Sequence, residues 1–312
     1  MQFSVYQESH IGGRKVNQDR MGYSFTRDAL LLVLADGMGG HLHGEIAAQL
    51  SLQVISQCFQ QQATPYVRKP ERFLEESLLE AHHAIHRYRE QHGLAETPRT
   101  TIVACLLQHN TASWAHCGDS RLYWLRGGQI LARTRDHSHV EALIAKGLVP
   151  ASARATHPDR NKLYNCLGAS ALPKIALSGR ASLLPGDQML LCSDGLWSML
   201  SDEELAARMQ AQTVVRAVPD MLGAALALGG RHGDNATALA IMWQGSVVTD
   251  GLDSVGAGLI STAALPQDLV GSTIQGMAAP APHEADAFDD AEIEKAIAEI
   301  RGAIEKSSQV LK

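Results

Sequence analysis

One run of apolar residues constrains the fold of this chain more than any other segment. Residues 30–35 are apolar at every position, which is typical of a β-strand buried on both faces. The run stops at Asp36, and Gly37 follows it at the start of a glycine-rich loop. A carboxylate at the end of a buried strand, beside a glycine that leaves the backbone carbonyl open to approach, is a candidate ligand for a hard divalent cation.

Three more aspartates occupy comparable places far apart in the sequence. Asp19 follows two polar residues, Asp194 follows an apolar run and precedes a glycine, and Asp234 follows a glycine-rich stretch. A single aspartate beside glycine is more often a turn, and Asp187, after a Pro-Gly pair, is interpreted as one. Together the other aspartates indicate a site for magnesium or manganese, whereas no Cys/His set has the spacing of a zinc site.

The order of the predicted elements indicates the class of fold. Apolar stripes predict helices in two pairs, over residues 43–62, 71–91, 202–211 and 213–228. Between the pairs, runs bounded by turn residues predict consecutive strands over 100–108, 111–117, 121–126 and 129–133. Sequential strands with helices in pairs favour antiparallel sheets in an α+β arrangement over alternating βαβ units.

Composition and charge disfavour several classes of function. The chain has 312 residues and a net charge of −6, which argues against a nucleic-acid binder. No stretch approaches the roughly 20 apolar residues that span a bilayer, and the first residues lack the pattern of a signal peptide. The 5 cysteines show no C-x-x-C spacing, which fits a reducing compartment. We therefore expect a cytoplasmic protein without a membrane or nucleic-acid partner.

The last part of the chain differs in composition from the rest. Residues 244–284 are rich in Gly, Ala, Ser, Thr and Pro, which predicts a flexible linker. Residues 285–312 carry isoleucines in one stripe and predict an amphipathic, acidic helix. From Ser246 onward there are 11 acidic and 4 basic residues, a net charge of −7. Three alternatives stay open: the helix binds a partner, associates with a second copy, or packs back on the preceding domain.

Seven short motifs occur in the order found in the metal-dependent protein phosphatases of type 2C. They are Arg14-Lys15-Val16-Asn17-Gln18-Asp19, Ala35-Asp36-Gly37-Met38-Gly39-Gly40, Thr100-Thr101, Cys117-Gly118-Asp119-Ser120-Arg121, Arg135-Asp136-His137-Ser138, Ser193-Asp194-Gly195-Leu196 and Asp234-Asn235-Ala236-Thr237. The chain resembles the compact bacterial branch of that family over about residues 3–243. The resemblance implies a catalytic domain over 1–243 and a four-layer α/β/β/α sandwich, in which helix pairs flank two antiparallel sheets.

The same resemblance implies roles for the clustered aspartates. Asp36 would bridge two manganese or magnesium ions, with Gly37 supplying a backbone carbonyl. Asp194 and Asp234 would complete the first site, and Asp19 would hold the second ion directly or through water. The two ions would activate a water for in-line attack on phosphorus, without a phospho-enzyme intermediate.

Two further residues of the motifs have implied roles. Asp119 resembles the residue that helps to hold a third, more labile ion, and its alternative is a strand-end aspartate that bonds turn amides. Arg14 resembles the guanidinium that grips the phosphoryl oxygens in a bidentate geometry, which a lysine cannot supply.

Several positions depart from the family pattern. Met38 stands where the eukaryotic branch has a histidine proposed as general acid, so the proton donor is unassigned, and His41 or a water is left to fill that role. Gln18 replaces a common glutamate. Arg99 stands where glycine is usual, and it is either strained or adds positive charge near the substrate.

Residues 136–168 correspond to the variable flap of the family, beside the active site. Arg154 and Arg160 in this flap contact the phosphopeptide or are solvated.

The resemblance implies an enzyme that removes phosphate from serine and threonine of phosphorylated proteins and opposes a bacterial Ser/Thr kinase. Two alternatives are kept. One is a catalytically weak regulator that binds phosphoproteins. The other is a phosphatase that acts on an anti-sigma-antagonist partner.

Overall fold

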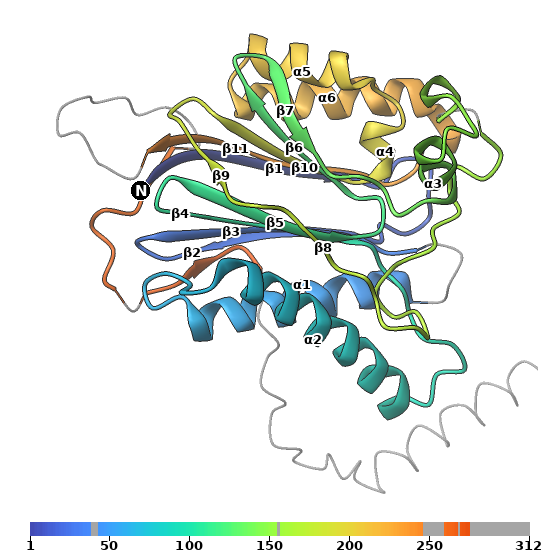
Figure 1. The fold of residues 1–312 in the computed structure, drawn as a ribbon, viewed down its shortest axis with the longest axis horizontal. Helices are drawn as coiled ribbons and strands as arrows, with labels where there is room; N and C mark the ends of the chain where they lie inside the picture. Colours follow the sequence, from blue (N-terminus) through green and yellow to red (C-terminus); the bar gives the residue numbers. More distant parts are fainter. Residues whose placement is uncertain (39–42, 155–156, 246–258, 268, 275–312) are drawn as a thin grey trace, which may run out of the picture. The chain divides into compact units, whose positions relative to one another are not determined.

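The computed structural model of the protein describes residues 1–38, 43–154, 157–245, 259–267 and 269–274. These residues form two antiparallel sheets packed face to face, with helices on both outer faces (Figure 1). The α+β class and the four-layer α/β/β/α sandwich expected from the sequence are confirmed.

The first sheet has six strands in the order β12-β1-β11-β10-β6-β7. Its strands are β1 (Gln2–His10), β6 (Arg121–Arg126), β7 (Gln129–Arg133), β10 (Gln188–Cys192), β11 (Ala236–Gly245) and β12 (Leu259–Ser261). The outer face is covered by α4 (Asp194–Trp197), α5 (Asp202–Ala211) and α6 (Val214–Gly229). A capping box begins α5, because Ser201 and Glu204 each bond the backbone N–H of the other.

The second sheet has seven strands, ordered β13-β2-β3-β4-β5-β8, with β9 also paired to β5. Its strands are β2 (Asp19–Phe25), β3 (Ala29–Asp36), β4 (Ile102–Gln108), β5 (Thr111–Cys117), β8 (Ala176–Leu177), β9 (Ala181–Ser182) and β13 (Gly271–Ser272). The helices α1 (Gly44–Gln62) and α2 (Pro70–Gln91) cover its outer face. The flap contributes α3 (His139–Ala145) and a short 3-10 helix (Ala151–Ala153), and a second one (Gly230–His232) precedes β11.

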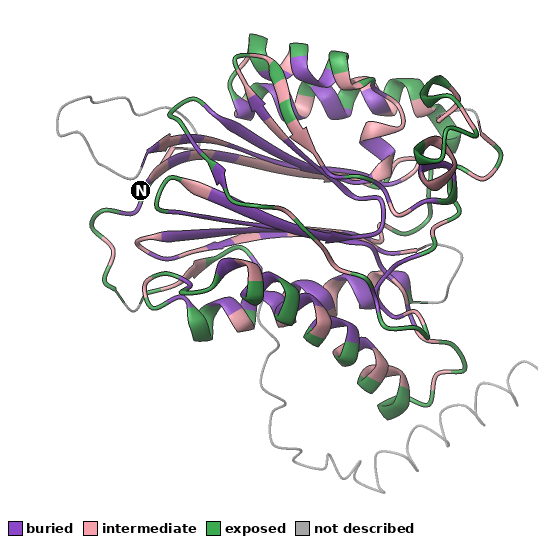
Figure 2. Ribbon diagram, in the orientation of Figure 1, coloured by how far each residue is buried: buried purple, intermediate pink, exposed green. Residues whose placement is uncertain are grey.

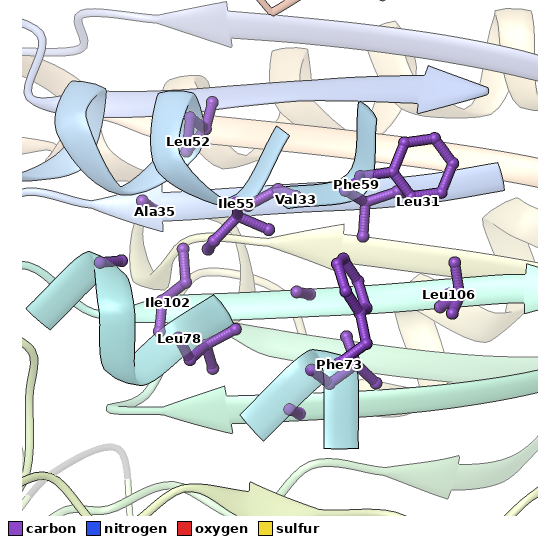
Figure 3. Packing of buried hydrophobic residues seen from close by; sticks show 14 of the residues in the cluster. Leu31, Val33, Ala35, Leu52, Ile55, Phe59, Phe73, Leu78, Ile102 and Leu106 are labelled. Atoms are coloured by element: carbon purple, nitrogen blue, oxygen red, sulfur yellow. The ribbon is translucent and has the colours of Figure 1, made fainter. Parts of the chain in front are cut away.

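The apolar run that ends at Asp36 is the central strand β3, and both of its faces are buried. Leu30, Leu32 and Leu34 point into the core between the sheets. Leu31, Val33 and Ala35 point the other way, into the core beneath α1 and α2 (Figure 3). Figure 2 shows the central strands of both sheets buried, with exposed residues on the outer helix faces and on the edge strand β7. A strand packed on both faces has little freedom to shift, so Asp36 is held at a fixed place.

The range expected to be a linker contains two short strands, which corrects the predicted boundary at residue 243. We call the described residues 259–267 and 269–274 the edge segment. Its β12 pairs with β1 and its β13 pairs with β2, so one segment completes the edge of both sheets. The compact unit runs from Met1 to Gln275. Strands of three and two residues carry no readable alternation, and they form because β1 and β2 offer unpaired edges. The helix predicted over 285–312 lies outside the described residues.

The edge segment is anchored by side chains as well as by strand pairing. Thr262 Oγ1 donates to the carbonyl of Arg27 at 2.7 Å. The hydroxyls of Ser272 and Ser24 are 2.8 Å apart. Ile274 is buried under the second sheet with the residues of α1 and α2.

Candidate active site

The predicted metal-binding aspartates lie at one end of the sandwich, because each stands at a strand end there. Asp19 begins β2 and Asp36 ends β3, and the two residues are directly opposite each other in the antiparallel pair. Asp194 follows β10, and Asp234 precedes β11, the antiparallel neighbour of β10. Ser193 Oγ donates to Asp19 Oδ2 at 2.7 Å and so joins the two sheets at this end.

Gly37 is required because the chain after Asp36 passes against the first residue of α1. A Cβ on Gly37 would lie 2.5 Å from the carbonyl of Gly44, and a Cβ on Gly44 would lie 2.9 Å from the side-chain nitrogen of Gln18. Real Cβ atoms do not approach other atoms so closely. The two glycines therefore allow the Asp36 turn, the start of α1 and the Gln18 side chain to share one small space.

Asn235 holds the loop that carries Arg14. Its side-chain nitrogen donates to the carbonyls of Ile11 at 2.8 Å and Val16 at 3.1 Å. Its side-chain oxygen accepts from the backbone N–H of Gln18 at 2.8 Å. Asn235 thus fixes both ends of the loop, beside Asp234. The motif that contains Asn235 was read from the sequence, but this role needs contacts across more than half of the chain.

Burial and mutual repulsion raise the pKa values of the clustered carboxyl groups. Burial, then the charges of Asp19 and Asp194, raises the pKa of Asp36 well above its ordinary value. Burial, then the charge of Asp119, does the same for Asp194. Burial is also the main cause that raises the pKa of Asp19 to about 6 and that of Asp119 to about 7. Such carboxyls resist ionising together at neutral pH unless positive charge is brought among them.

The donor set fits hard divalent cations. The donors are oxygens, and Oδ1 of Asp19 is buried without a hydrogen-bond partner. Within the described residues, no three His, Cys, Asp or Glu side chains are arranged to hold an ion by themselves. Three side chains on one ion are not needed, since magnesium and manganese keep several waters and backbone carbonyls can complete the shell. The unsatisfied oxygen and the concentration of buried carboxyls are what a cation would relieve.

Arg14 lies beside the aspartates on the solvent side. Its Nη2 donates to Asp234 Oδ2 at 2.5 Å, and its side chain is 53% exposed. The neighbouring Asp234 raises the pKa of Arg14, so the guanidinium is a permanent cation here. The loop packs tightly, because a Cβ on Gly12 would lie 2.1 Å from the carbonyl oxygen of Asp234. An exposed guanidinium on a fixed loop is well placed to meet an anion that arrives from solvent.

A cavity of about 720 Å³ is lined by Arg14, by residues of the flap and by residues of the helices on the first sheet. Asp194 and Asp234 also line it. The flap contributes Arg154 and Arg160, and α4 contributes Trp197. The remaining wall is partly apolar and includes Val140, Met199, Leu200 and Leu228.

The two flap arginines have different surroundings. Arg154 donates to the two carboxylate oxygens of Glu141 at 2.8 and 3.3 Å, and Glu141 is itself buried. Arg154 therefore ties the 3-10 turn of the flap to α3 even without a substrate. Arg160 lines the cavity and, within the described part of the chain, forms no ion pair. Of the two arginines, Arg160 is therefore the one whose guanidinium is not held by a carboxylate of the described residues.

The positions that depart from the family pattern are only partly described. Arg99 is not among the residues that line the described cavity; its Nε is buried without a partner, and its carbonyl accepts from the N–H of Met38 at 3.0 Å. Gln18 donates to Glu45 Oε2 at 3.1 Å. His41 lies outside the described residues.

Residues 6–227 match the model of the protein phosphatase 2C family. The chain therefore belongs to this family. The serine/threonine protein phosphatase PstP of Mycobacterium tuberculosis is 32% identical over 210 residues, which are 67% of this chain and 39% of PstP. The serine/threonine phosphatase stp of Listeria monocytogenes is 28% identical over 231 residues, 73% of this chain and 90% of its own length. The chain thus spans about two fifths of the length of PstP.

Solved structures show the same fold. The crystal structure of PstP/Ppp from M. tuberculosis has a TM-score of 0.69 at 30% identity and covers 78% of this chain and 100% of that chain. The catalytic domain of PstP in complex with 2 manganese ions has a TM-score of 0.66 at 28% identity, covering 77% and 98%. No helix among the described residues has the length and apolar character needed to cross a membrane.

Proposed function

We propose that this chain hydrolyses phosphoserine and phosphothreonine in proteins, in a reaction that depends on divalent cations. The observation that carries the proposal is the gathering of carboxylates at one end of the sandwich, buried at Asp19 and Asp119 and partly buried at Asp36, Asp194 and Asp234, beside a cavity that Arg14 lines. Membership of the protein phosphatase 2C family supports the reaction class. The names of the mycobacterial and listerial relatives support serine and threonine as the substrate residues.

We assign the cations to the aspartates at the strand ends. Asp36 and the carbonyl of Gly37 would hold two ions of manganese or magnesium, with Asp194 and Asp234 on the first and Asp19 on the second. When bound, the ions would supply an activated water and positive charge for the phosphoryl group.

The remaining chemistry belongs to side chains at the mouth of the site. Arg14 would turn from Asp234 to two phosphoryl oxygens, because a bidentate guanidinium matches that geometry. The cavity wall would receive the peptide on either side of the phosphorylated residue, with Arg160 near acidic side chains. Met38 has no proton to give to the leaving oxygen, which leaves His41 or a water as the donor.

The biological setting follows from the reaction class. We place the protein in the cytoplasm, opposite a Ser/Thr kinase whose products it dephosphorylates. We assign residues 285–312 to contact with a partner or with a second copy. The alternative of a catalytically weak phosphoprotein-binding regulator has less support, because a pure binding module has no need of this many buried carboxylates.

The proposal is tested by hydrolysis of p-nitrophenyl phosphate and of a phosphoserine peptide, with and without added manganese. Asp36→Ala and Asp194→Ala should each abolish turnover. Asp220→Ala, which removes an exposed carboxylate on α6, should leave it unchanged. Turnover that needs no metal, or that survives both active-site substitutions, would exclude this mechanism.

A further inference from the structure

We infer that Trp197 and Ser120 are positioning residues that fix Asp119 at the metal-binding end of the sandwich, where its carboxylate can hold a third cation. This inference rests on the proposed function and adds two residues to it. Asp119 lies in the turn between β5 and β6, and it is buried. A turn between two strands normally has some freedom to move, so the contacts that remove this freedom decide where the carboxylate stands.

The first contact comes from α4. The indole nitrogen of Trp197 donates to the backbone carbonyl of Asp119 at 2.9 Å. Trp197 is the last residue of the short helix that Asp194 begins. A single helical turn therefore connects the carboxylate of Asp194 to the backbone of Asp119.

The second contact comes from the opposite sheet. The hydroxyl of Ser120 is 2.6 Å from that of Thr101, and both side chains are buried. The backbone N–H of Thr101 donates to the carbonyl of Asp36 at 2.8 Å. Gly118, with a φ of +114°, lets the turn approach, since a Cβ there would lie 2.5 Å from the Cβ of Thr101. Ser120 therefore connects the turn to Asp36.

Trp197 is itself held in place by Arg121. The guanidinium carbon of Arg121 lies 3.6 Å from the centroid of the Trp197 ring, within the range of a cation–π contact. Asp136 fixes this guanidinium with two hydrogen bonds of 2.8 and 2.7 Å, and both side chains are 3% exposed. Tyr123 accepts a further bond from Arg121 at 3.0 Å. A buried bidentate pair is costly to disturb, so the indole has a rigid support.

These contacts tie Asp119 to Asp36 on one side and to Asp194 on the other. Ions held by Asp36 and Asp194 would therefore fix the same turn that presents Asp119. The third ion should bind most weakly and should be the first to be lost when either contact is removed.

Trp197→Phe tests the inference, because phenylalanine keeps an aromatic ring and lacks the indole N–H; the atoms of the indole that it also loses are equally lost in the control. Trp124→Phe is a matched control. Trp124 also lies near an arginine, with the guanidinium carbon of Arg126 at 5.3 Å, and it donates to Asp187 Oδ2 at 3.1 Å. Asp187 immediately precedes β10, whereas Asp194 lies just beyond its other end. Ser120→Ala is the second test variant, and Asp119→Ala shows the loss of the site itself.

Manganese chloride is titrated calorimetrically into the metal-free full chain, and hydrolysis of p-nitrophenyl phosphate is measured against manganese concentration. Trp197→Phe and Ser120→Ala should each weaken the weakest manganese site by about five-fold, the worth of one hydrogen bond, and leave the tighter sites unchanged. Trp124→Phe should match the wild type.

Equal affinity of the weakest site in wild type, Trp197→Phe and Ser120→Ala would overturn the inference. So would a wild-type protein that binds only two ions, but hydrolysis would then continue and the proposed function would stand. If all ions bind and no hydrolysis is seen, the proposed function fails instead.

Discussion

Gly195 lies so close to Asn235 that a Cβ added to the glycine would be 2.1 Å from the carbonyl oxygen of Asn235. The residue before each of them is one of the predicted metal ligands, Asp194 and Asp234. The close approach of the two backbones is therefore what brings these carboxylates together. Glycine at position 195 is a requirement of packing, since the contact is with backbone that cannot turn away.

Replacing Gly195 with alanine should separate the two turns. We expect Gly195→Ala to lower the free energy of unfolding by about 3 kcal/mol, the upper range for overpacking, and to abolish calorimetric binding of manganese. Gly223→Ala is the matched control, because Gly223 is exposed on α6 with no atom within 4 Å of an added Cβ. That variant should be more stable by up to about 1 kcal/mol. Normal manganese binding in Gly195→Ala would contradict the packing argument.

The raised pKa of Asp119 predicts a pH dependence of the metal-free protein. Folding raises this pKa from 3.8 to about 7, so the protonated carboxyl favours the folded state and this stability is lost as pH rises from about 4 to about 7. His82 and His137, whose pKa values burial lowers from 6.5 to about 4, give the opposite slope over part of this range.

The effect of Asp119 is therefore measured as a difference between wild type and Asp119→Asn. In chelator, thermal melts should show the variant gaining stability over wild type as pH rises from about 4 to about 7. Added manganese should reduce the difference in stability between Asp119→Asn and wild type at pH 7, because the cation offsets the negative charge that the variant lacks. A gap that stays constant with pH would show that Asp119 ionises normally.

We expect the two flap arginines to have different roles, with Arg160 acting on substrate binding and Arg154 on stability. We expect Arg160→Ala to raise KM about three-fold for a phosphopeptide with acidic flanking residues and to leave p-nitrophenyl phosphate unaffected, since an exposed ion pair is weak. Lys162→Ala, at an exposed flap residue paired with Asp159, should leave both unchanged. Equal KM values for Arg160→Ala and Lys162→Ala would argue against a substrate contact.

Arg154→Ala should instead act on folding. It leaves the buried Glu141 without its closest guanidinium partner, which should cost about 1–2 kcal/mol of stability. Thermal melts check this. A changed KM for the phosphopeptide with unchanged stability would show instead that Arg154 contacts the substrate.

The edge segment should contribute to stability although it follows the family-like domain. A chain ending at Gln275 should melt at the same temperature as the full chain, whereas one ending at Gly245 should melt much lower. Ile274→Ala should cost about 2 kcal/mol, because it removes buried methyl groups next to β2. Leu269→Ala, at a side chain that is 47% exposed, should cost little. Equal melting of the two truncated chains would show that the segment does not support the fold.

The sequence predicted the features that depend on local pattern. The apolar run before Asp36 indicated a strand buried on both faces, and β3 has that burial. The helix expected over 43–62 is α1 over Gly44–Gln62. The candidate aspartates were singled out because each stands at the end of a strand or beside a glycine, and the strand ends that carry them do meet.

The features that were missed depend on contacts distant in sequence. Nothing near Trp197 indicates that its indole bonds the carbonyl of Asp119, 78 residues away. The ion pair of Arg154 with Glu141 was missed because Glu141 lies on a separate helix. The edge segment was read as a linker because its strands are shorter than any periodic pattern. In each case the structure depends on the residue or strand that forms the contact, and the local sequence does not indicate that contact.

The edge segment also has a consequence for the behaviour of the protein in concentrated solution. Without it, β1 and β2 would each present a row of free N–H and C=O groups, and such rows are templates for strands of other molecules. The edge segment pairs with part of each row, at Gln2–Ser4 of β1 and at Ser24 and Phe25 of β2. A chain cut before residue 259 would therefore leave the edges of β1 and β2 unpaired at the same time. Light scattering should then find fibrous or amorphous aggregates at concentrations where the longer chain stays monodisperse.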